Sequence, residues 1–526
     1  MRVLGHRAFY FWIAVAACYA VWPPFHSGHA WQVFVQDDCF YYLKVAQNLA
    51  TGHGSTFNGL VATNGYHPLW LLLLAGVCAL FGPTAFFPLI AFMVFAAILG
   101  TYFAARIILL RAGISPLVAN TLAALVAGFS MPMFFTGMEV ILTIPIGLFF
   151  LALCISADPD RHGFYHALGL GCVISCLVLS RLDTVLLGML LLAALLLQPH
   201  LRSGIRRQHV AGVLLGLIPL GLYFVSNQVF FHTWMPVSGM AKQMRWHHFP
   251  SRQVWHSFFI GPVRHYGSFL PIVLAFPLLF KCFHKLSDTE KVVYSAVLVW
   301  PFAYILVLSC LSDWMLWMWY FYPFRLAFCV ALALIFSWEP VVRLTRRPAI
   351  IVLLAMISVV KLFTARWTPG DVPEMVEVGQ RVAAFSQTHH GTYAMGDRAG
   401  SVGFLMQDPL VQTEGLVMDR SYLESIRRQG SLRKALRVRG VRYYIATSLE
   451  PLRECLQVSE PFQAGPDSPH LQDLFCDTPV ARFKEGDRTT AIFDLQSDED
   501  QNAIPKPNSG KAAERLGKVL LSEPKF

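Results

Sequence analysis

The first 360 residues alternate between apolar runs and short polar segments, the pattern of a chain that crosses a membrane repeatedly. The first run, residues 8–22, follows Arg2, His6 and Arg7 and predicts a span that begins in the cytoplasm. Further runs predict spans of alternating direction at 86–105, 117–135, 140–157, 164–180, 184–197, 210–231, 267–280, 292–311, 326–338 and 350–360. The pattern predicts a polytopic α-helical membrane protein with about eleven transmembrane helices plus juxtamembrane helices.

A cleaved signal peptide is the competing interpretation of the first run, because Gly28-His29-Ala30 loosely resembles a cleavage site. Trp22-Pro23-Pro24 stands between the run and that site, and a polytopic protein needs no cleaved signal. We therefore expect a retained first span, followed by a first external loop at residues 23–85.

The apolar run from Leu69 to Phe81 is too short to cross a hydrocarbon core, which takes about 20 residues. If it crossed, Arg202, Arg206 and Arg207 would lie outside the cell; if it does not, every short basic loop is cytoplasmic. The charge distribution therefore predicts a juxtamembrane or re-entrant helix here.

The composition changes abruptly after Lys361, where long apolar runs end. Residues 392–395, 441–447 and 490–495 alternate like strands, and residues 421–428 and 431–437 are helix-like. This predicts a transmembrane part at 1–363, an extracytoplasmic α/β domain at 364–496 and a mostly disordered tail at 497–526. The segment Gly396-Asp397-Arg398-Ala399-Gly400 superficially resembles a nucleotide loop but lacks both phosphate-loop patterns.

Composition agrees with a membrane protein: 55% of the residues are hydrophobic, 14% are charged and the mean hydropathy is +0.50. The formal net charge of +10 does not indicate nucleic-acid binding, because the basic residues cluster in short loops between apolar runs. Of the cysteines, Cys455 and Cys476 both lie in the predicted external domain, where an oxidising compartment would allow a disulfide.

A polar island at residues 36–70 interrupts the apolar pattern. It begins with Asp37 and Asp38, a carboxylate pair that is costly to bury unpaired, so we expect it at the membrane surface or in a wet cavity. The following spacing is helical and places Asp37 at or near the N-cap, where plain capping is an equally good explanation. Several glycines then flank hydrogen-bonding side chains that include Asn64, Tyr66 and His67.

Other ionisable residues fall at predicted outer span ends, where they are functional candidates. Glu139 lies between the third and fourth spans, and Arg181 and Asp183 lie between the fifth and sixth. A snorkelling arginine paired with an aspartate for packing is the alternative. Arg325 lies at the outer end of another span, next to the aromatic turn 313–323, which either lines a groove or forms an interfacial belt.

The external loop at 227–262 combines basic and aromatic residues in a way that suits a lipid-linked phosphate, which is charged at its headgroup and apolar in its tail. Lys242 is our candidate for contact with that phosphate, with Arg325 as a second. His247-His248 lacks the spacing of a zinc-ligating helical pair, so no metal site is predicted in this loop.

The island, with the order DDxFYYLKxAxNLAxGxGxTFNG…TNGYHPLW, resembles the first external loop of the GT-C superfamily of membrane glycosyltransferases. Thr136-Gly137-Met138-Glu139, Arg181-Leu182-Asp183 and Met235–Lys242 resemble shorter family patterns, although Val140 and Leu182 depart from them. The resemblance implies an enzyme that transfers a sugar from a polyprenyl-phosphate-linked donor to a glycan, lipid or protein acceptor. It also implies that Asp37 or Asp38 acts as general base or positions the acceptor.

The same resemblance implies an inverting reaction at the outer face of a bacterial inner membrane, with no cofactor that is certain. Some relatives bind a divalent metal at the acidic motif, and the sequence does not decide this for the present chain. Two other functions remain open: a transporter or flippase for a lipid-linked glycan, and an inactive binding subunit of the same shape.

Overall fold

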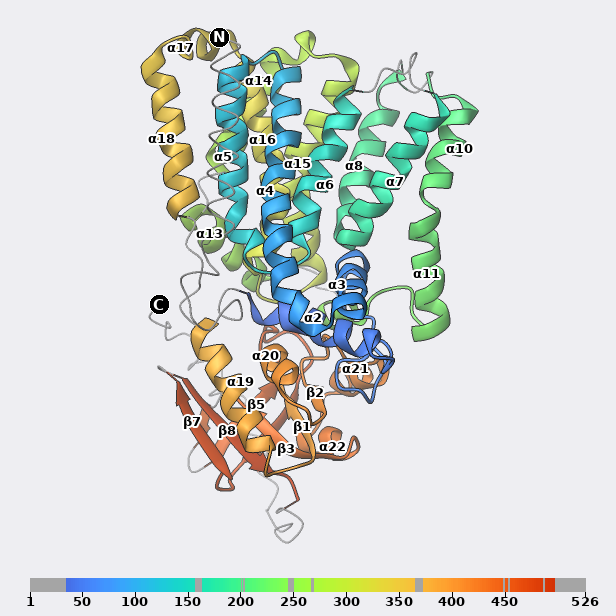
Figure 1. The fold of residues 1–526 in the computed structure, drawn as a ribbon, viewed down its shortest axis with the longest axis vertical. Coiled ribbons are helices and arrows are strands. Elements are labelled where there is room, and N and C mark those ends of the chain that lie inside the picture. Colours follow the sequence, from blue (N-terminus) through green and yellow to red (C-terminus); the bar gives the residue numbers. More distant parts are fainter. Residues whose placement is uncertain are drawn as a thin grey trace.

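The computed structural model describes residues 35–156, 163–199, 201, 204–244, 250–265, 269–364, 372–447, 450–452, 455–485 and 488–496. A helical bundle forms one end of the molecule and a domain with two β-sheets forms the other, with α2 and α3 between them (Figure 1). The predicted first span, the loop at 158–162, His247-His248 and the predicted disordered tail lie outside the described residues.

The bundle follows the predicted spans closely. Its helices are α4 (Phe86–Arg111), α5 (Pro116–Phe134), α6 (Val140–Ser156), α7 (Phe164–Ser180), α8 (Val185–Leu196), α10 (Arg207–Gly216), α11 (Ile218–Phe231), α14 (Phe269–Cys282), α15 (Asp288–Leu311), α16 (Tyr322–Ser337) and α18 (Pro348–Thr364). Three further helices lie in the connections: α12 (Val237–Lys242), α13 (Arg252–His265) and α17 (Glu339–Leu344). The apolar runs of the sequence therefore located each of these helices to within a few residues at most ends.

The helices of the bundle differ more in length than the prediction of about eleven spans implies. Among the described residues, four helices are long and apolar enough to cross a membrane, and α10 with α11 makes a fifth if the pair, bent by 46°, counts as one span. The bend precedes Pro219, whose missing N–H interrupts helical hydrogen bonding. The other apolar helices are shorter, so the structure supports a membrane bundle without establishing the count of eleven.

Burial separates the bundle core from its outer surface. Most of α5 and α16 is buried, whereas Leu192 on α8 and Phe230 on α11 are 57% and 71% exposed. Large exposed apolar side chains are expected where helices face lipid rather than water.

Helix α3 (Pro68–Phe81) has 14 residues and packs against α2 (Asp37–Ala50). At 1.5 Å per residue its length is about 21 Å, shorter than a membrane core of about 30 Å. Figure 1 shows both helices at the end of the bundle that faces the sheets. This position fits the predicted juxtamembrane helix.

The C-terminal domain contains a five-stranded sheet in the order β2-β1-β3-β8-β7. Its strands are β1 (Thr392–Met395), β2 (Leu410–Gln412), β3 (Val441–Ala446), β7 (Ala481–Glu485) and β8 (Arg488–Asp494), and only β1, β2 and β3 run parallel. The helices are α19 (Val372–Ser386), α20 (Ala399–Leu405), α21 (Arg420–Arg427) and α22 (Leu432–Arg437). The predicted strands and helices of this domain are present within a few residues.

A second antiparallel sheet, β4-β5-β6, was not predicted. It comprises β4 (Glu450–Leu452), β5 (Cys455–Glu460) and β6 (Leu471–Phe475). A disulfide joins Cys455 to Cys476, the pair that the sequence offered, and it ties the start of β5 to the residue after β6. The short strands lack a clear alternation of apolar residues, which explains why the sequence pattern missed them.

Candidate functional site

The acidic pair lies in the first turn of α2, after an extended Gln36. Asp37 is the first residue of α2 and follows the N-cap residue Gln36, close to the predicted position. Its two carboxylate oxygens accept hydrogen bonds from the backbone N–H groups of Gly400 and Ser401, each at 2.8 Å. These N–H groups belong to the first turn of α20, where helical donors lack partners and favour an anion.

The Gly396–Gly400 segment, which we discounted as a nucleotide loop, forms part of the site. It connects β1 to α20 and brings Gly400 against α2, so close that a Cβ atom there would lie 2.2 Å from the backbone oxygen of Asp37. Only glycine allows this approach. The signal in the sequence was a glycine-rich turn between a strand and a helix, but nothing there identified its partner.

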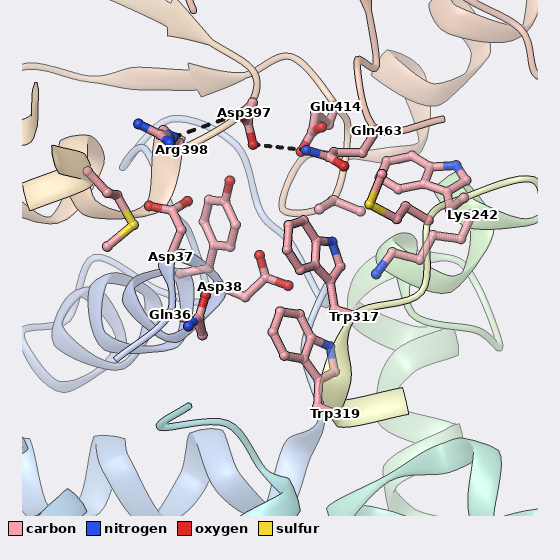
Figure 2. A pocket seen from close by; sticks show the side chains of 15 residues that line it. Gln36, Asp37, Asp38, Lys242, Trp317, Trp319, Asp397, Arg398, Glu414 and Gln463 are labelled. Carbon is pink, nitrogen blue, oxygen red and sulfur yellow. Dashed lines mark hydrogen bonds and ion pairs between the residues drawn. The ribbon is translucent and has the colours of Figure 1, made fainter. Parts of the chain in front are cut away.

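The side chain of Asp38 points in a different direction from that of Asp37 (Figure 2). Within the described part of the chain its carboxylate has no hydrogen-bond partner, and it lines two adjoining cavities. Burial raises the pKa of Asp38 to about 6, Lys242 opposes this rise, and Glu139 and Asp397 add to it. The arrangement gives a carboxylate that is free to meet a ligand and titrates near neutrality.

The first cavity lies between α2, the aromatic turn and the C-terminal domain. Its lining consists of Gln36, Asp37, Asp38, Tyr41, Lys242, Trp314, Met315, Trp317, Trp319, Met375, Asp397, Arg398, Glu414, Leu416 and Gln463. Asp397, Arg398, Glu414 and Gln463 were missed at the sequence level, because they come from a domain whose docking the sequence does not reveal.

The second cavity lies on the bundle side of Asp38. Its lining includes Tyr42, Tyr66, His67, Glu139, Arg181, Ser238 and Tyr320. Asp38, Tyr41, Lys242, Trp319 and Leu416 line both cavities. A molecule in one cavity therefore meets a molecule in the other beside Asp38 and Lys242.

Lys242 ends the short helix α12, and its Nζ donates a hydrogen bond of 2.7 Å to the Tyr320 hydroxyl. The same atom lies 5.6 Å from the centre of the Trp314 ring. Burial lowers the pKa of Lys242, but Tyr320 and Asp38 raise it, and the net shift is upward. The lysine is therefore a cation that faces both cavities.

Asn64 does not line either cavity; it holds the segment that carries Lys242. Its side-chain oxygen accepts a hydrogen bond from the Val237 N–H at 2.9 Å, and its amide donates to the Asn227 side chain at 3.2 Å. Asn64 is 2% exposed, so these bonds are shielded from water. Asn64 therefore positions α12, and its predicted contact with substrate stays a prediction.

Glu139, Arg181 and Asp183 converge in one buried network. Arg181 donates to Glu139 at 2.6 Å and to Asp183 at 2.8 Å. Asp183 also accepts from the hydroxyls of Tyr304 and Tyr322, at 2.7 and 2.8 Å. Arginine holds the pKa of Asp183 down at about 2 against the effect of burial. The network leaves Glu139 and Arg181 in the wall of the second cavity, whereas Asp183 lies behind that wall.

His67 and Tyr66 also line the second cavity. The Leu182 N–H donates to Nδ1 of His67 at 3.4 Å, which leaves Nε2 facing Glu139 at 3.8 Å. Burial lowers the pKa of His67. The Tyr66 hydroxyl is paired with Ser55 at 2.7 Å.

Arg325 is not brought to the cavities. It is 1% exposed within α16, and its guanidinium lies 6.0 Å from the centre of the Phe129 ring on α5. Its place at the start of α16 turns the side chain into the bundle, which one-dimensional spacing could not show. The structure therefore does not place it with Lys242 as a phosphate ligand.

The aromatic turn supplies one wall of the first cavity through Trp314, Trp317 and Trp319. Trp317 and Trp319 stack with ring centres 5.8 Å apart and planes within 10°. Groove lining, one of the two alternatives for this turn, thus describes these residues.

No group of three or more His, Cys, Asp or Glu side chains in the described residues is arranged to hold a metal ion. Both oxygens of Asp37 already accept backbone N–H groups. The divalent metal at the acidic motif stays a prediction from the resemblance, and no step below depends on it.

No protein-family model matches the chain, and no curated protein matches its sequence. The fold is similar to the crystal structure of ArnT from Cupriavidus metallidurans in the apo state, with a TM-score of 0.52 and 14% identity over 83% of this chain and 92% of that one. The archaeal oligosaccharyltransferase AglB from Archaeoglobus fulgidus, in complex with an inhibitory peptide and a dolichol-phosphate, matches with a TM-score of 0.48 and 12% identity. That match covers 84% of this chain and 69% of AglB.

Proposed function

We propose that this chain, which has the fold of the GT-C superfamily, is a membrane glycosyltransferase that uses a lipid-linked sugar donor. One observation carries the proposal: among the described residues, Asp38 is the carboxylate and Lys242 the ammonium group that line both cavities. Transfer needs a base for the acceptor and a cation for the leaving phosphate at one point, and these two residues meet that need.

The donor phosphate would bind at Lys242, because an ammonium group forms charge-assisted hydrogen bonds with phosphate oxygens. Its sugar would lie in the second cavity, where Tyr66, His67 and the Arg181 guanidinium offer polar contacts. Asn64 supports this geometry indirectly through the segment before α12. The polyprenyl part of the donor follows from the family resemblance.

The acceptor would approach through the first cavity. Its hydroxyl group attacks the anomeric carbon while its proton passes to the Asp38 carboxylate. The bond from the anomeric carbon to the phosphate oxygen breaks, and polyprenyl phosphate leaves with the electron pair beside Lys242. This single displacement inverts the anomeric centre. A base whose pKa is near 6 is well matched to proton transfer at neutral pH.

Asp37 has a different role in this proposal. Its carboxylate is engaged by the first turn of α20, so it joins the C-terminal domain to α2 and fixes the orientation of Asp38. It is a positioning residue, and this assigns separate roles to two aspartates that the sequence could not distinguish.

The site is proposed to face the outside of a bacterial inner membrane. α17 carries Arg343 and lies at the end of the bundle opposite the sheets (Figure 1). Basic residues favour the cytoplasmic side, which puts the C-terminal domain outside. The Cys455–Cys476 disulfide fits an oxidising compartment.

The test is transfer by purified full-length protein from a panel of undecaprenyl-phosphate sugars labelled with carbon-14, with a cell-envelope extract as acceptor. Asp38→Asn should lower kcat by about 100-fold or more, the usual range for loss of a general base. Asp37→Asn should lose less activity, and its loss should follow its thermal stability. A wild-type protein that moves labelled lipid across vesicles without cleaving it would be a transporter. Binding without either activity would identify a binding subunit.

A further inference from the structure

Glu414 places a buried carboxylate oxygen in the first cavity without a partner. The residue is 3% exposed and lines the cavity, and Figure 2 shows it beside Gln463. Gln412 donates a hydrogen bond of 3.1 Å to Oε2, and the Gln463 backbone N–H lies near the carboxylate. Within the described residues no donor reaches Oε1 with hydrogen-bonding geometry. A buried acceptor without a donor is costly, so this oxygen indicates a ligand group that donates to it.

The turn that carries Glu414 is held rigidly. The side-chain oxygen of Gln412 accepts from the Leu416 N–H at 2.8 Å, and Tyr422 donates to the Thr413 carbonyl at 2.9 Å. Gly415 follows with a φ of +80°, a backbone conformation that favours glycine. The carboxylate is therefore fixed in the cavity wall before any ligand arrives, as a recognition group should be.

The ionisable groups of the first cavity are unbalanced toward negative charge. Four carboxylates line it (Asp37, Asp38, Asp397 and Glu414), against two cations, Lys242 and Arg398. The charge of Asp37 is balanced by the backbone N–H groups in the first turn of α20, and that of Asp397 by Arg398 at 3.9 Å. Burial and the neighbouring acids raise the pKa of Glu414. A cationic ligand would relieve this repulsion and keep the carboxylate charged.

The opposite wall is aromatic, through Trp314, Trp317 and Trp319. Aromatic faces attract cations within about 6 Å. Carboxylates together with tryptophan faces form a site for a cation, whereas a neutral polyol would leave the negative charge uncompensated.

We propose, resting on the glycosyltransferase function above, that the first cavity is the acceptor subsite and recognises a primary ammonium group through Glu414. The ammonium donates a hydrogen bond to Oε1 of Glu414, while a hydroxyl of the same acceptor points to Asp38. The acceptor is thus an amine-bearing hydroxyl compound, such as an amino sugar or a lipid whose headgroup carries an amine. Recognition is non-covalent and moves no electrons.

Binding is tested first, with no donor present. Thermal unfolding of the full-length protein is followed with glucosamine and, separately, with N-acetylglucosamine, which has the same ring without the charge. Glucosamine should stabilise the wild-type protein more strongly, and Glu414→Gln should raise its half-maximal concentration at least tenfold. Glu424→Gln is the matched control, because Glu424 is a partly exposed glutamate that pairs with Arg427 on α21 and lines neither cavity.

Equal shifts from the two sugars would overturn the proposal, as would unchanged glucosamine binding in Glu414→Gln. Manganese chloride is tested alone as well. A stabilisation by Mn²⁺ that is stronger than that by glucosamine and is lost in Glu414→Gln would make the cavity a metal site and also overturn it.

Assays of sugar transfer then test ammonium recognition separately from the glycosyltransferase function on which it rests. With labelled donor and no acceptor, the control variant Glu424→Gln should release polyprenyl phosphate as fast as the wild type. With amine-bearing acceptors the KM of Glu414→Gln should rise at least tenfold, whereas with their N-acetylated forms its KM should change much less. An equal loss with both acceptor forms would contradict ammonium recognition. Absence of both transfer and donor cleavage in the wild-type protein would contradict the glycosyltransferase function itself.

Discussion

The Asp37 carboxylate and the Gly400 N–H meet at 2.8 Å, although 363 positions separate them in the chain. This contact joins the polar loop of the membrane part to the first turn of a helix in the C-terminal domain. The neighbouring Asp38 remains turned toward the two cavities. One member of the acidic pair therefore holds the two parts together, and the other faces the two cavities.

Gly400→Ala should loosen this junction. The added Cβ would lie 2.2 Å from the Asp37 backbone oxygen, so α20 or α2 must move. Such overpacking costs about 1–3 kcal/mol. We expect a lower thermal unfolding midpoint and a reduced kcat, measured on detergent-solubilised protein. Gly430→Ala is the control, because a Cβ there meets nothing within 4 Å. Equal behaviour of the two variants would contradict the role given to this contact.

The pH dependence of transfer should report Asp38. A base must be deprotonated to accept a proton, and burial raises the pKa of Asp38 to about 6. Activity should therefore be full above this value and decline about tenfold per unit below it. The profile of kcat/KM between pH 4.5 and 8 measures this. A flat profile over that range contradicts general-base catalysis by this residue.

Two variants test whether the acid limb of the kcat/KM profile belongs to Asp38 or to Asp37. Lys242 lowers the pKa of Asp38, so Lys242→Met should move the midpoint to higher pH. Burial raises the pKa of Asp37 to about 7, against hydrogen bonds from Ser401 and Gly400. Asp37→Asn removes that titration and should keep the acid limb if Asp38 is the base.

The sequence predicted the bundle well because lipid imposes a simple rule: a helix in a membrane must be apolar over most of its length. Residues 164–180, for example, were placed at the exact bounds of α7. The C-terminal domain was predicted only in outline. Residues 450–475, which contain β4, β5 and β6, have no clear two-residue alternation, so propensity alone could not reveal a second sheet.

The site was predictable where its residues share one motif and not where it is built between domains. Family-like patterns gave Asp38, Glu139, Arg181 and Lys242, which the structure brings to the cavities. They could not give Glu414 or Asp397, because contact between distant segments leaves no mark in local spacing. Arg325 shows the opposite error: its position at a span end predicted exposure to ligand, but its helix turns it inward.

Lys242→Met should weaken binding of the donor phosphate. Its ammonium is the cation shared by both cavities, so its loss removes a charge-assisted contact with the phosphate. Contacts of this kind contribute about 1.5–3 kcal/mol, which corresponds to a rise in donor KM of about tenfold to 100-fold. Kinetics against donor concentration measure this effect. Lys434→Met, on the exposed side of α22, should leave KM unchanged. An unchanged donor KM in Lys242→Met would remove the lysine from the phosphate site.

Arg181→Met should be the most destabilising substitution considered, because Arg181 compensates two acids. Without it, Glu139, which is 1% exposed, keeps only the Tyr42 hydroxyl at 3.0 Å and the distant His67 ring. Removing one partner of a buried ion pair costs about 3–5 kcal/mol. Unfolding by sodium dodecyl sulfate should show a loss of this size, and Glu139→Gln combined with Arg181→Met should recover part of it.

The control for this network is Arg343→Met, which breaks an exposed pair with Glu339 on α17. Exposed pairs contribute about 0–1 kcal/mol, so this variant should unfold like the wild type. A similar small loss in Arg181→Met would mean that water or lipid headgroups reach Glu139 once the arginine is gone. The second cavity would then be open to solvent at this wall, and a donor sugar placed against it would gain little from these two side chains.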